Sequence, residues 1–371
     1  MKIALIANST YPIIEPFVGG LEKITYLLAR TLMERGLEVD LYGHPDSDPL
    51  LNVQDISSET DKDRRVYKNL SQSEDTDIDN LSEQMGYIRA MMKIRFGNYD
   101  VVHNHAYHYI PMVMGNILNV PMITSAHTPP VERLQYGSLG IKGNNRMVFT
   151  MVSKSLAETW NRWIPNATVV YNGVEIEKWP FIAQPAGEYL FWYGRICEEK
   201  GTRLAIEAAE LANIPLKIAG PVFDERYFEK SIRPLIKEGS VDYLGHLNQS
   251  QLAPLVGNAK AVLFSSLWDE PFGLTLIESM ACGTPIVAFE GGAVSEILNK
   301  DCGIIVPNGS VKCMASAIAK VLSLSRYSCR KHVELKFSYQ IMVDKYLRLY
   351  DSMRVKHLSR GVEQFPELVA N

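Results

Sequence analysis

The stretch "LWDEPFGLTLIESMACGTPIVAFEGG", Leu267 to Gly292, carries the clearest sign of how this chain folds. It follows the apolar run "AVLFSS" (Ala261 to Ser266), passes through a Pro-Phe-Gly turn and a segment with helical spacing, and ends in a second apolar run closed by two glycines. Continuous apolar runs that alternate with helices are typical of a parallel sheet covered on both faces. The stretch therefore predicts an α/β core, and it places Glu270 and Glu278 around the turn.

The same alternation recurs along the chain. In the first half the apolar runs are "KIALIA" (Lys2 to Ala7), "EVDLYG" (Glu38 to Gly43), "DVVHNH" (Asp100 to His105), "PMITSAH" (Pro121 to His127), "MVFTMVS" (Met147 to Ser153) and "TVVYNG" (Thr168 to Gly173). In the second half they are "YLFWYG" (Tyr189 to Gly194), "LKIAG" (Leu216 to Gly220), "VDYLG" (Val241 to Gly245), "AVLFSS", "PIVAFEG" (Pro285 to Gly291) and "CGIIV" (Cys302 to Val306). Two similar α/β halves follow from this repetition.

The fold class is therefore α/β, with two Rossmann-like domains that face each other across a cleft. The join lies where apolar periodicity lapses and prolines appear, so the predicted domains are 1–175 and 176–339. An amphipathic helical pattern near the C-terminus, at about 340–371, is expected to cross back to the first domain. Open parallel sheets bind ligands at the carboxyl ends of their strands, which is where the chemistry is expected.

Composition excludes several classes of protein. The chain has 371 residues, a formal net charge of -4 and ordinary fractions of apolar and charged residues, so nucleic acid is not an expected partner. Its five cysteines are odd in number and form no Cys-x-x-Cys pair, which is typical of a reduced, cytoplasmic protein. No apolar run is long enough to span a membrane, and the first residues lack the pattern of a signal peptide.

One segment, Asp55 to Glu83, stands out for its acidity. It carries nine Asp or Glu against four Lys or Arg, a local charge of 4 - 9 = -5. Such a composition predicts a surface excursion without a packed core. A second segment, "PPVERLQYGSLGIKGNN" (Pro129 to Asn145), is also interpreted as a loop of the first domain.

Two places in the sequence suggest anion binding. In "YGRICEEKG", Arg195 follows a predicted strand and Lys200 comes five residues later, so that the two cations are able to bracket a diphosphate. Gly19 and Gly20 precede a helix that starts near Leu21, and a helix N-terminus with glycine admits a phosphate to the backbone. The alternatives are solvated surface charge for the cations and a simple turn for the glycines. Neither Gly-x-Gly-x-x-Gly nor a P-loop occurs.

The Pro-Phe-Gly turn suggests a sugar or nucleotide contact. Glu270 lies in the predicted loop, residues 271–274 begin a helix, and Glu278 falls about one turn inside it. Backbone N–H groups from Phe272 to Thr275 are then available to an anion or a hydroxyl group. Two carboxylates are able to accept paired hydrogen bonds from the vicinal diols of a sugar or a ribose. The alternative is a capping acid followed by a solvated helical glutamate.

Two further segments have alternative interpretations. In "HNHAYHY", strand alternation puts His103 and His105 on one face, but no Cys or acid stands nearby, so a role at the strand end in the cleft is preferred to a metal site. The segment "YIRAMMKIRF" (Tyr87 to Phe96) is either a basic amphipathic membrane contact or a helix that faces the core through Ile88, Met91, Met92 and Arg95. The core-facing interpretation is preferred, and peripheral membrane contact stays open.

The ordered motifs resemble a known family. They are "GGLE" (Gly19 to Glu22), "SAHTP" (Ser125 to Pro129), "VYNGVE" (Val170 to Glu175), "YGRICEEKG" (Tyr193 to Gly201), "EPFGLTLIESMACGTPIVA" (Glu270 to Ala288) and "GGAVSEI" (Gly291 to Ile297). Together they are similar to the retaining glycosyltransferases of family four, which have the GT-B fold. The six pieces stand in order over most of the chain.

The resemblance implies roles for particular residues. Arg195 and Lys200 would hold the donor diphosphate and stabilise its departure, and Glu278 would bind the ribose diol. Glu270 would contact the donor sugar and phosphate, and His127 would lie beside the transferred sugar. The remaining donor-binding residues that it implies are Gly19, Gly20, Pro271, Phe272, Gly273, Leu274 and Thr275. The catalytic set is His127, Arg195, Lys200 and Glu270.

The resulting hypothesis is an enzyme that moves a sugar from a nucleoside diphosphate sugar, with UDP-sugar as the expected donor, to a small-molecule, glycan or lipid-linked acceptor. Fixed cations and helix N-termini are able to stabilise the leaving diphosphate, so neither a metal nor a cofactor is expected. Retention by same-face attack is favoured by the resemblance over double displacement. The alternatives are a nucleotide-sugar epimerase or hydrolase, and a non-catalytic sugar-nucleotide binding subunit.

Overall fold

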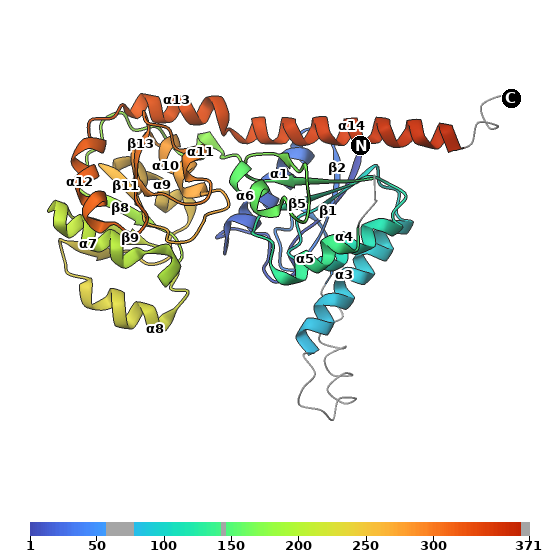
Figure 1. Cartoon of the computed structure of the whole chain (residues 1–371), viewed down its shortest axis with the longest axis horizontal. Coiled ribbons are helices and arrows are strands. Elements are labelled where there is room, and N and C mark those ends of the chain that lie inside the picture. The colour runs from blue at the N-terminus through green and yellow to red at the C-terminus, as the bar shows by residue number, and fades with distance from the viewer. Residues whose placement is uncertain (57–77, 142–145, 365–371) are drawn as a thin grey trace. The chain divides into compact units, whose positions relative to one another are not determined.

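The computed structural model describes residues 1–56, 78–141 and 146–364, and they form two α/β units (Figure 1). Unit 1 consists of Met1–Val152, Ala157–Val170 and the described residues from Val343 onward; unit 2 consists of Ser153–Leu156 and Tyr171–Met342. The predicted class of two Rossmann-like domains is confirmed. The chain changes unit after Val170, where the sequence placed the join after residue 175, and again at Val343 rather than at about 340.

The described part of unit 1 holds a seven-stranded parallel sheet in the order β3-β2-β1-β4-β5-β6-β7. Its strands are β1 (Lys2–Ile6), β2 (Glu38–Gly43), β3 (Asn52–Asp55), β4 (Val101–Asn104), β5 (Met122–Ala126), β6 (Met147–Met151) and β7 (Thr168–Val169). Six of them fall inside predicted runs. The sequence missed β3, because an edge strand with polar residues lacks a continuous apolar run.

Helices connect these strands. They are α1 (Gly20–Glu34), α3 (Ile78–Phe96), α4 (Tyr109–Met114), the 3₁₀ turn η1 (Gly115–Ile117), α5 (Glu132–Leu139), α6 (Lys154–Trp160) and the long C-terminal helix α14 (Tyr339–Gln364). Both α6 and α14 pass from one unit into the other along the chain.

Two predicted loops are wrong in part. Residues 132–139 of the supposed 129–145 loop form α5, because an apolar face packs against α4. The acidic segment begins in β3, and its last residues, from Ile78, belong to α3; residues 57–77 and 142–145 lie outside the described residues.

The predicted inner face of α3 is also wrong in part. Met91 is buried as expected, but Met92 is 40% exposed, and Ile88 and Arg95 are only half-buried. The helix instead turns Tyr87, Met91 and Ile94 inward. Helical spacing identified an apolar stripe, but two apolar stripes share this helix, and the spacing did not say which one is buried.

The described part of unit 2 holds a six-stranded parallel sheet in the order β10-β9-β8-β11-β12-β13. Its strands are β8 (Leu190–Tyr193), β9 (Leu216–Ala219), β10 (Val241–Tyr243), β11 (Ala261–Phe264), β12 (Ile286–Phe289) and β13 (Gly303–Val306). Its helices and turns are η2 (Ile176–Lys178), η3 (Glu198–Lys200), α7 (Thr202–Ala212), α8 (Glu225–Tyr227), η4 (Phe228–Ile232), η5 (Arg233–Leu235), α9 (Gln249–Asn258), α10 (Leu274–Ala281), α11 (Val294–Ile297), α12 (Val311–Val321) and α13 (Arg326–Lys336).

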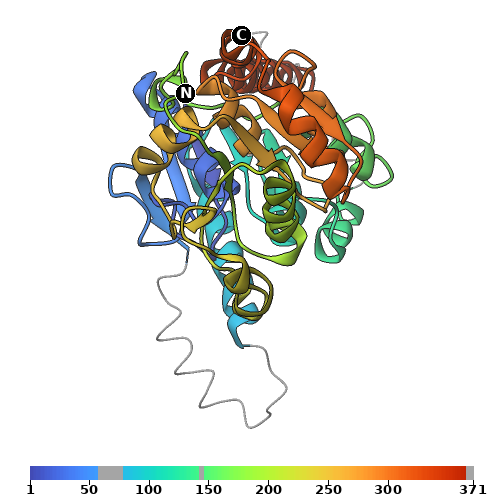
Figure 2. The same cartoon turned by 90° about the vertical axis from the view of Figure 1, so that its left-hand side faces the viewer.

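Helices cover both faces of the unit 2 sheet (Figure 2). Alternating residues of its strands face these two helical layers. Leu190 and Trp192 of β8 join a core with α7 and α12, whereas Tyr193 points to the other face and reaches α10. Because both faces are covered, each strand is apolar throughout, which is the pattern that the sequence showed.

Each sheet reverses its strand order at one point, between β1 and β4 in unit 1 and between β8 and β11 in unit 2. Connections leave in opposite directions there, so the carboxyl ends of these strands form the usual binding position of open α/β sheets. The candidate residues follow exactly these strands or their neighbours. In the described parts of the chain, no helix is both long and apolar enough to cross a bilayer.

Candidate active site

The loop after β8 lies against the end of β11 in unit 2. Gly201, which follows η3, has φ +64°, and a Cβ atom there would lie 2.1 Å from the carbonyl oxygen of Ser265. Leu267 N–H donates to the carbonyl oxygen of Glu199 (2.8 Å), which ties η3 to the loop after β11. The close backbone approach brings Lys200, the last residue of η3, beside the Pro-Phe-Gly segment.

Lys200 and Glu270 form a partly buried ion pair in this loop cluster. Lys200 Nζ contacts Glu270 Oε1, and the Lys200 and Glu270 side chains are only 16% and 11% exposed. Ser266 Oγ donates to the same carboxylate oxygen (3.1 Å). A buried carboxylate with two hydrogen-bond partners is held in one orientation. Solvated surface charge, the alternative for Lys200, is therefore wrong.

The second glycine turn fixes the backbone of Glu270. Gly292 has φ +50°, and a Cβ atom there would lie 2.2 Å from the carbonyl oxygen of Glu270. Ala293 N–H donates to that same carbonyl (2.9 Å), and Gly292 N–H donates to Asp269 Oδ1 (2.9 Å). Gly291 and Gly292, which end the stretch Leu267 to Gly292, therefore let the loop after β12 lie directly on the loop that carries Glu270.

Helix α10 begins at Leu274 with Gly273 as its N-cap, so the predicted start at residues 271–274 is close to the observed one. The Gly273 cap has a left-handed backbone conformation, and no side chain caps the helix. Phe272 is buried at 3% exposure, and its ring lies at a tilt to Tyr171 and edge-on to Phe337, with centroids 6.2 and 6.1 Å away, which anchors the turn. Unsatisfied amides and partial positive charge at this end are suited to an anion.

Glu278 is 5% exposed on α10, so its alternative interpretation as a solvated helical glutamate is also wrong. Tyr193 Oη lies 3.3 Å from Glu278 Oε2 and donates to the carbonyl oxygen of Thr275 (2.9 Å). Burial, and then the charge of Glu278, hold the pKa of Tyr193 well above its usual range, so the phenol stays a neutral donor. Tyr193 thus links the end of β8 to the first turns of α10.

The Arg195 side chain is more exposed than those of Lys200 and Glu270. Its guanidinium lies 4.7 Å from the ring centroid of Phe223 and pairs with Glu199 Oε1 at 3.4 Å, with its side chain 35% exposed. Stacking leaves the guanidinium edge able to bind a further anion.

Unit 1 carries the other predicted residues. Gly19 is the N-cap and Gly20 the first residue of α1, so the helix begins one residue before the expected start near Leu21. A Cβ atom at Gly19 would lie 2.9 Å from Glu22 Oε2, and Glu22 is buried. The absence of a side chain at Gly19 therefore makes room for the Glu22 carboxylate, and it also leaves the backbone open to close approach by a ligand.

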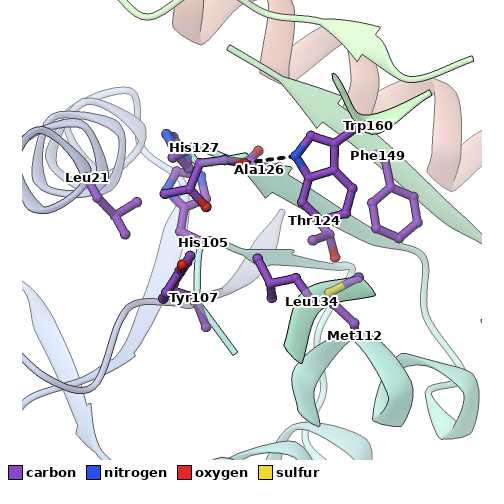
Figure 3. A pocket seen from close by; sticks show the side chains of 13 residues that line it. Leu21, His105, Tyr107, Met112, Thr124, Ala126, His127, Leu134, Phe149 and Trp160 are labelled. Carbon is purple, nitrogen blue, oxygen red and sulfur yellow. Dashed lines mark hydrogen bonds between the residues drawn. The ribbon is translucent and has the colours of Figure 1, made fainter. Parts of the chain in front are cut away.

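His127 follows β5 and lines a small pocket of unit 1 (Figure 3). The wall is largely apolar, with Leu134, Phe149 and Trp160 on one side, and Trp160 Nε1 donates to the carbonyl oxygen of Thr128 (2.8 Å). His127 Nε2 is buried and has no hydrogen-bond partner in the described part of the chain. Burial lowers the pKa of His127 to about 4, so the imidazole is neutral at pH 7.

A buried hydrogen-bond network adjoins this pocket. His103 of β4 and His105, which directly follows β4, lie on one side of the chain, as strand alternation predicted, with their Nε2 atoms 3.1 Å apart. His103 Nδ1 lies 2.7 Å from Tyr350 Oη on α14, and His105 Nδ1 lies 3.0 Å from Thr25 Oγ1 on α1. The ring centroid of His105 is 4.8 Å from that of His127.

The donor directions in this network follow from its chemistry. Thr25 Oγ1 donates to the carbonyl oxygen of Leu21 (2.8 Å), so its proton is used and His105 Nδ1–H must donate to it. Burial lowers the pKa of His103 to about 3 and that of His105 well below its usual range, so both rings are neutral. His105 Nε2 is then unprotonated, so the proton of His103 lies on Nε2, between Ser125 Oγ (2.7 Å) and His105 Nε2 (3.1 Å), and Tyr350 O–H donates to His103 Nδ1.

Each unit thus brings together part of the predicted set. Arg195, Lys200, Glu270, Glu278 and residues 271–275 gather at the β8 and β11 ends of unit 2, while Gly19, Gly20 and His127 follow strands of unit 1. Sequence reasoning assigned no role to Tyr193, Ser266 or Tyr350; Tyr193 is the first residue of the motif "YGRICEEKG", but nothing in the sequence marks Tyr350. No group of three or more His, Cys, Asp or Glu side chains in the described residues is placed to bind a metal ion.

Two Rossmann-like units with polar groups at their strand ends define a two-domain α/β protein. The model for glycosyltransferase family 4 matches residues 18–178, and the model for glycosyl transferases group 1 matches residues 175–334. The chain belongs to the family-four glycosyltransferases with the GT-B fold, and it is a hexosyltransferase.

Known proteins agree with this assignment. Glycogen synthase from Mycobacterium tuberculosis (strain CDC 1551 / Oshkosh) is 25% identical over 369 residues, which cover 87% of this chain and 86% of the relative. Sucrose-phosphate synthase from Thermosynechococcus elongatus has a TM-score of 0.74 at 19% identity, covering 96% of this chain and 99% of that one. HepE from Anabaena, solved with UDP and glucose, has a TM-score of 0.69 at 18% identity, covering 95% and 100%.

Proposed function

We propose that this enzyme transfers a sugar with retention from a nucleoside diphosphate sugar, in the first place a UDP-sugar, to a glycan, small-molecule or lipid-linked acceptor in the cytoplasm. The observation that carries the proposal is the set of buried charges at the strand reversal of unit 2, where Lys200 and Glu270 pair beside the N-terminus of α10. Charges are buried at a cost unless they are paired or serve a ligand. The UDP in the HepE structure supports the choice of donor.

In this proposal the diphosphate lies between Lys200, Arg195 and the first amides of α10. As the glycosidic bond breaks, negative charge grows on the leaving diphosphate, and fixed cations with helix amides stabilise that charge without waiting for solvent to reorganise. Lys200 already holds one carboxylate, Glu270, so the incoming phosphate replaces or shares that contact. These groups fill the role that a divalent cation fills in other transferases, so the reaction is proposed to need none.

Glu278 is assigned to the ribose diol and Glu270 to the donor sugar. Both carboxylates are buried, and a buried carboxylate that accepts paired hydroxyl groups discriminates strongly against ligands that lack them. Glu270 is held by Lys200 and Ser266, which favours a binding role over a nucleophilic one. Same-face attack assisted by the leaving phosphate is therefore proposed. His127, neutral and with Nε2 unpartnered, is assigned to a hydroxyl group of the transferred sugar.

The test is release of nucleoside diphosphate from UDP-, GDP- and ADP-sugars, with EDTA present and no acceptor. The variants are Lys200→Met and Glu278→Gln, with the exposed Lys237→Met as the matched control. Slow release from one donor, reduced at least about 100-fold in both site variants and unchanged in the control, is expected. Loss of activity with EDTA that Mg²⁺ restores would overturn metal independence.

The remaining outcomes separate the alternatives. Conversion of the donor to an epimer identifies an epimerase, and binding of a nucleotide sugar without turnover, even with candidate acceptors, identifies a binding subunit. Absence of both binding and cleavage at millimolar donor would reject the nucleotide-sugar site altogether.

A further inference from the structure

The tryptophan of the loop after β11, Trp268, has a backbone that is held on both sides. Asn308 Nδ2 donates to the carbonyl oxygen of Leu267 (3.1 Å), and Asp269 Oδ1 accepts from the N–H of Gly292 (2.9 Å). Trp268 is the residue between these two anchors and is itself half-buried. The loop therefore fixes the position from which the indole ring extends.

The indole ring of Trp268 contacts the cation that is assigned to the diphosphate. Lys200 Nζ lies 5.4 Å from the centroid of the ring, and the same ammonium group contacts Glu270 Oε1. A cation over an aromatic face is attracted by the negative π-cloud, and more strongly where water is displaced. The Lys200 side chain is only 16% exposed, so the ring and the carboxylate together hold the ammonium group in place.

The N–H group of the Trp268 ring has no acceptor. Trp268 Nε1 is buried and lacks a hydrogen-bond partner in the described part of the chain. By contrast, Trp192 Nε1 donates to Ser265 Oγ (2.9 Å), and Trp160 Nε1 donates to the carbonyl oxygen of Thr128 (2.8 Å). An indole N–H is only a donor, and burying it without an acceptor costs stability. A ligand that brings the missing oxygen removes this cost.

The carboxylates around Trp268 do not supply that oxygen. Four of them lie within two residues of Lys200 or Trp268 along the chain. Glu198 is exposed to solvent, and the others already have partners, which are Arg195 for Glu199 (3.4 Å), the N–H of Gly292 for Asp269 (2.9 Å), and Lys200 with Ser266 for Glu270. An oxygen bound at Lys200 thus meets a cation and a neutral donor together, which is suited to a phosphate group.

We propose that Trp268 is a further donor-binding residue, whose indole N–H donates to a diphosphate oxygen held by Lys200. The role rests on the proposed function, since it needs a nucleoside diphosphate at Lys200. Its hydrogen bond strengthens as negative charge grows on the leaving diphosphate. The aromatic face keeps the Lys200 ammonium group in place when the phosphate takes over the contact with Glu270.

The experiment is nuclear magnetic resonance of the full chain, labelled with ¹⁵N at the indole nitrogens of its five tryptophans. The Trp268 signal is the one missing from Trp268→Phe, or from Trp268→Tyr where the Phe variant does not fold. Added UDP should move this proton signal downfield, because a hydrogen bond to an anionic oxygen deshields the proton. GDP and ADP replace UDP where calorimetry detects no binding of UDP.

Trp163 provides the matched control. The Arg162 guanidinium lies 5.4 Å from the centroid of its ring, so a cation stands over this indole as well, but Trp163 belongs to unit 1. Its signal should therefore move far less on addition of UDP. In calorimetry, Trp268→Phe should raise the dissociation constant of UDP about 10-fold, whereas Trp163→Phe should change it by less than about twofold.

The outcomes separate this role from the proposed function. A downfield shift of the Trp268 signal, with weaker binding by Trp268→Phe, supports the role. Binding of UDP that leaves this signal in place would overturn it, as would equal dissociation constants for the Trp268→Phe and Trp163→Phe variants. A shift caused by a UDP-sugar but not by UDP would also overturn it and assign the N–H to a sugar hydroxyl group. Failure of UDP, GDP and ADP alike to bind at millimolar concentration would reject the nucleotide site itself, and the role of Trp268 with it.

Discussion

Units 1 and 2 both place polar side chains at the carboxyl ends of the strands where their sheets reverse order. The side chains of unit 2 are charged, and those of unit 1 are neutral. At the strand ends of unit 2, Lys200 and Glu270 are paired as ions in a partly buried loop cluster. At the strand ends of unit 1, His103, His105 and His127 are neutral because burial lowers their pKa values.

The physical lesson lies in how each unit offsets the cost of burying polar groups. Unit 2 buries ions beside each other and near a helix N-terminus, which is suited to a charged ligand. Unit 1 keeps its histidines uncharged and passes hydrogen bonds from α14 through β4 to α1, which is suited to hydroxyl groups. Variants of unit 2 should therefore impair nucleotide binding, and variants of unit 1 should impair the transfer step.

The largest expected effect comes from Gly292→Ala in unit 2. The new Cβ atom would meet the carbonyl oxygen of Glu270 at 2.2 Å and push its loop away, so donor cleavage should fall about 100-fold. Gly239→Ala is the control, because Gly239 also has a positive φ (+80°) but no atom within 4 Å of its Cβ position. Equal loss in the two variants would assign the effect to backbone strain instead of displacement of Glu270.

The next effect tests unit 1 through His127→Asn. Loss of a hydrogen bond from a buried ring to the transferred sugar should lower kcat about 30-fold. The dissociation constant of the nucleoside diphosphate, measured by calorimetry, should stay within about twofold, because the nucleotide contacts belong to unit 2. A weakened nucleotide with unchanged kcat would contradict the division of labour between the units.

Low pH should lower the free energy of unfolding of unit 1 more than that of unit 2. Above about pH 6.5 the histidines are neutral in the folded and unfolded chain, so their pKa shifts add nothing. As pH falls below 6.5, the unfolded chain takes up protons that buried His103, with a pKa of about 3, does not. Each such histidine then removes about 1.4 kcal/mol of stability per pH unit, a loss confined to the window between the two pKa values.

This loss should fall mainly on unit 1. Of the residues described, unit 1 buries His103, His105, His108 and His127 with lowered pKa values, whereas unit 2 does so with His332. Hydrogen exchange, corrected for the intrinsic pH dependence, should show β4 losing protection before β8 as pH falls from 7 to 5, by about 2 kcal/mol per fully buried histidine. Parallel loss in both strands would contradict the neutral state assigned to the network.

The smallest expected effect is that of Tyr350→Phe. The substitution removes the donor to His103 Nδ1 and leaves that buried acceptor unsatisfied, so the free energy of unfolding should fall by about 1–2 kcal/mol. Tyr327→Phe, at an exposed tyrosine of unit 2, should change little. Urea unfolding monitored by tryptophan fluorescence measures both, and equal stability of the two variants would remove Tyr350 from the network.

Sequence by itself determined the elements of this protein and the order of its motifs. Strand and helix periodicity are local properties, so the apolar runs located twelve of the described strands, eleven of them within two residues at either end, and missed the polar edge strand β3. Lys200, Glu270 and Glu278 were predicted as ligand-binding residues for the same reason, because each lies within a short stretch of sequence after a predicted strand.

Only the tertiary structure decided which side chains meet and which face of a helix is buried. The contact between His103 and Tyr350 spans 247 residues, and the ion pair of Lys200 with Glu270 spans 70, so no local spacing encodes either. Likewise, both sides of α3 carry apolar residues at helical spacing, and only the packing of Tyr87 against the end of β1 turns Phe96 outward. Pairing and burial depend on which distant segments lie side by side in the folded chain, and that information is spread over the whole sequence.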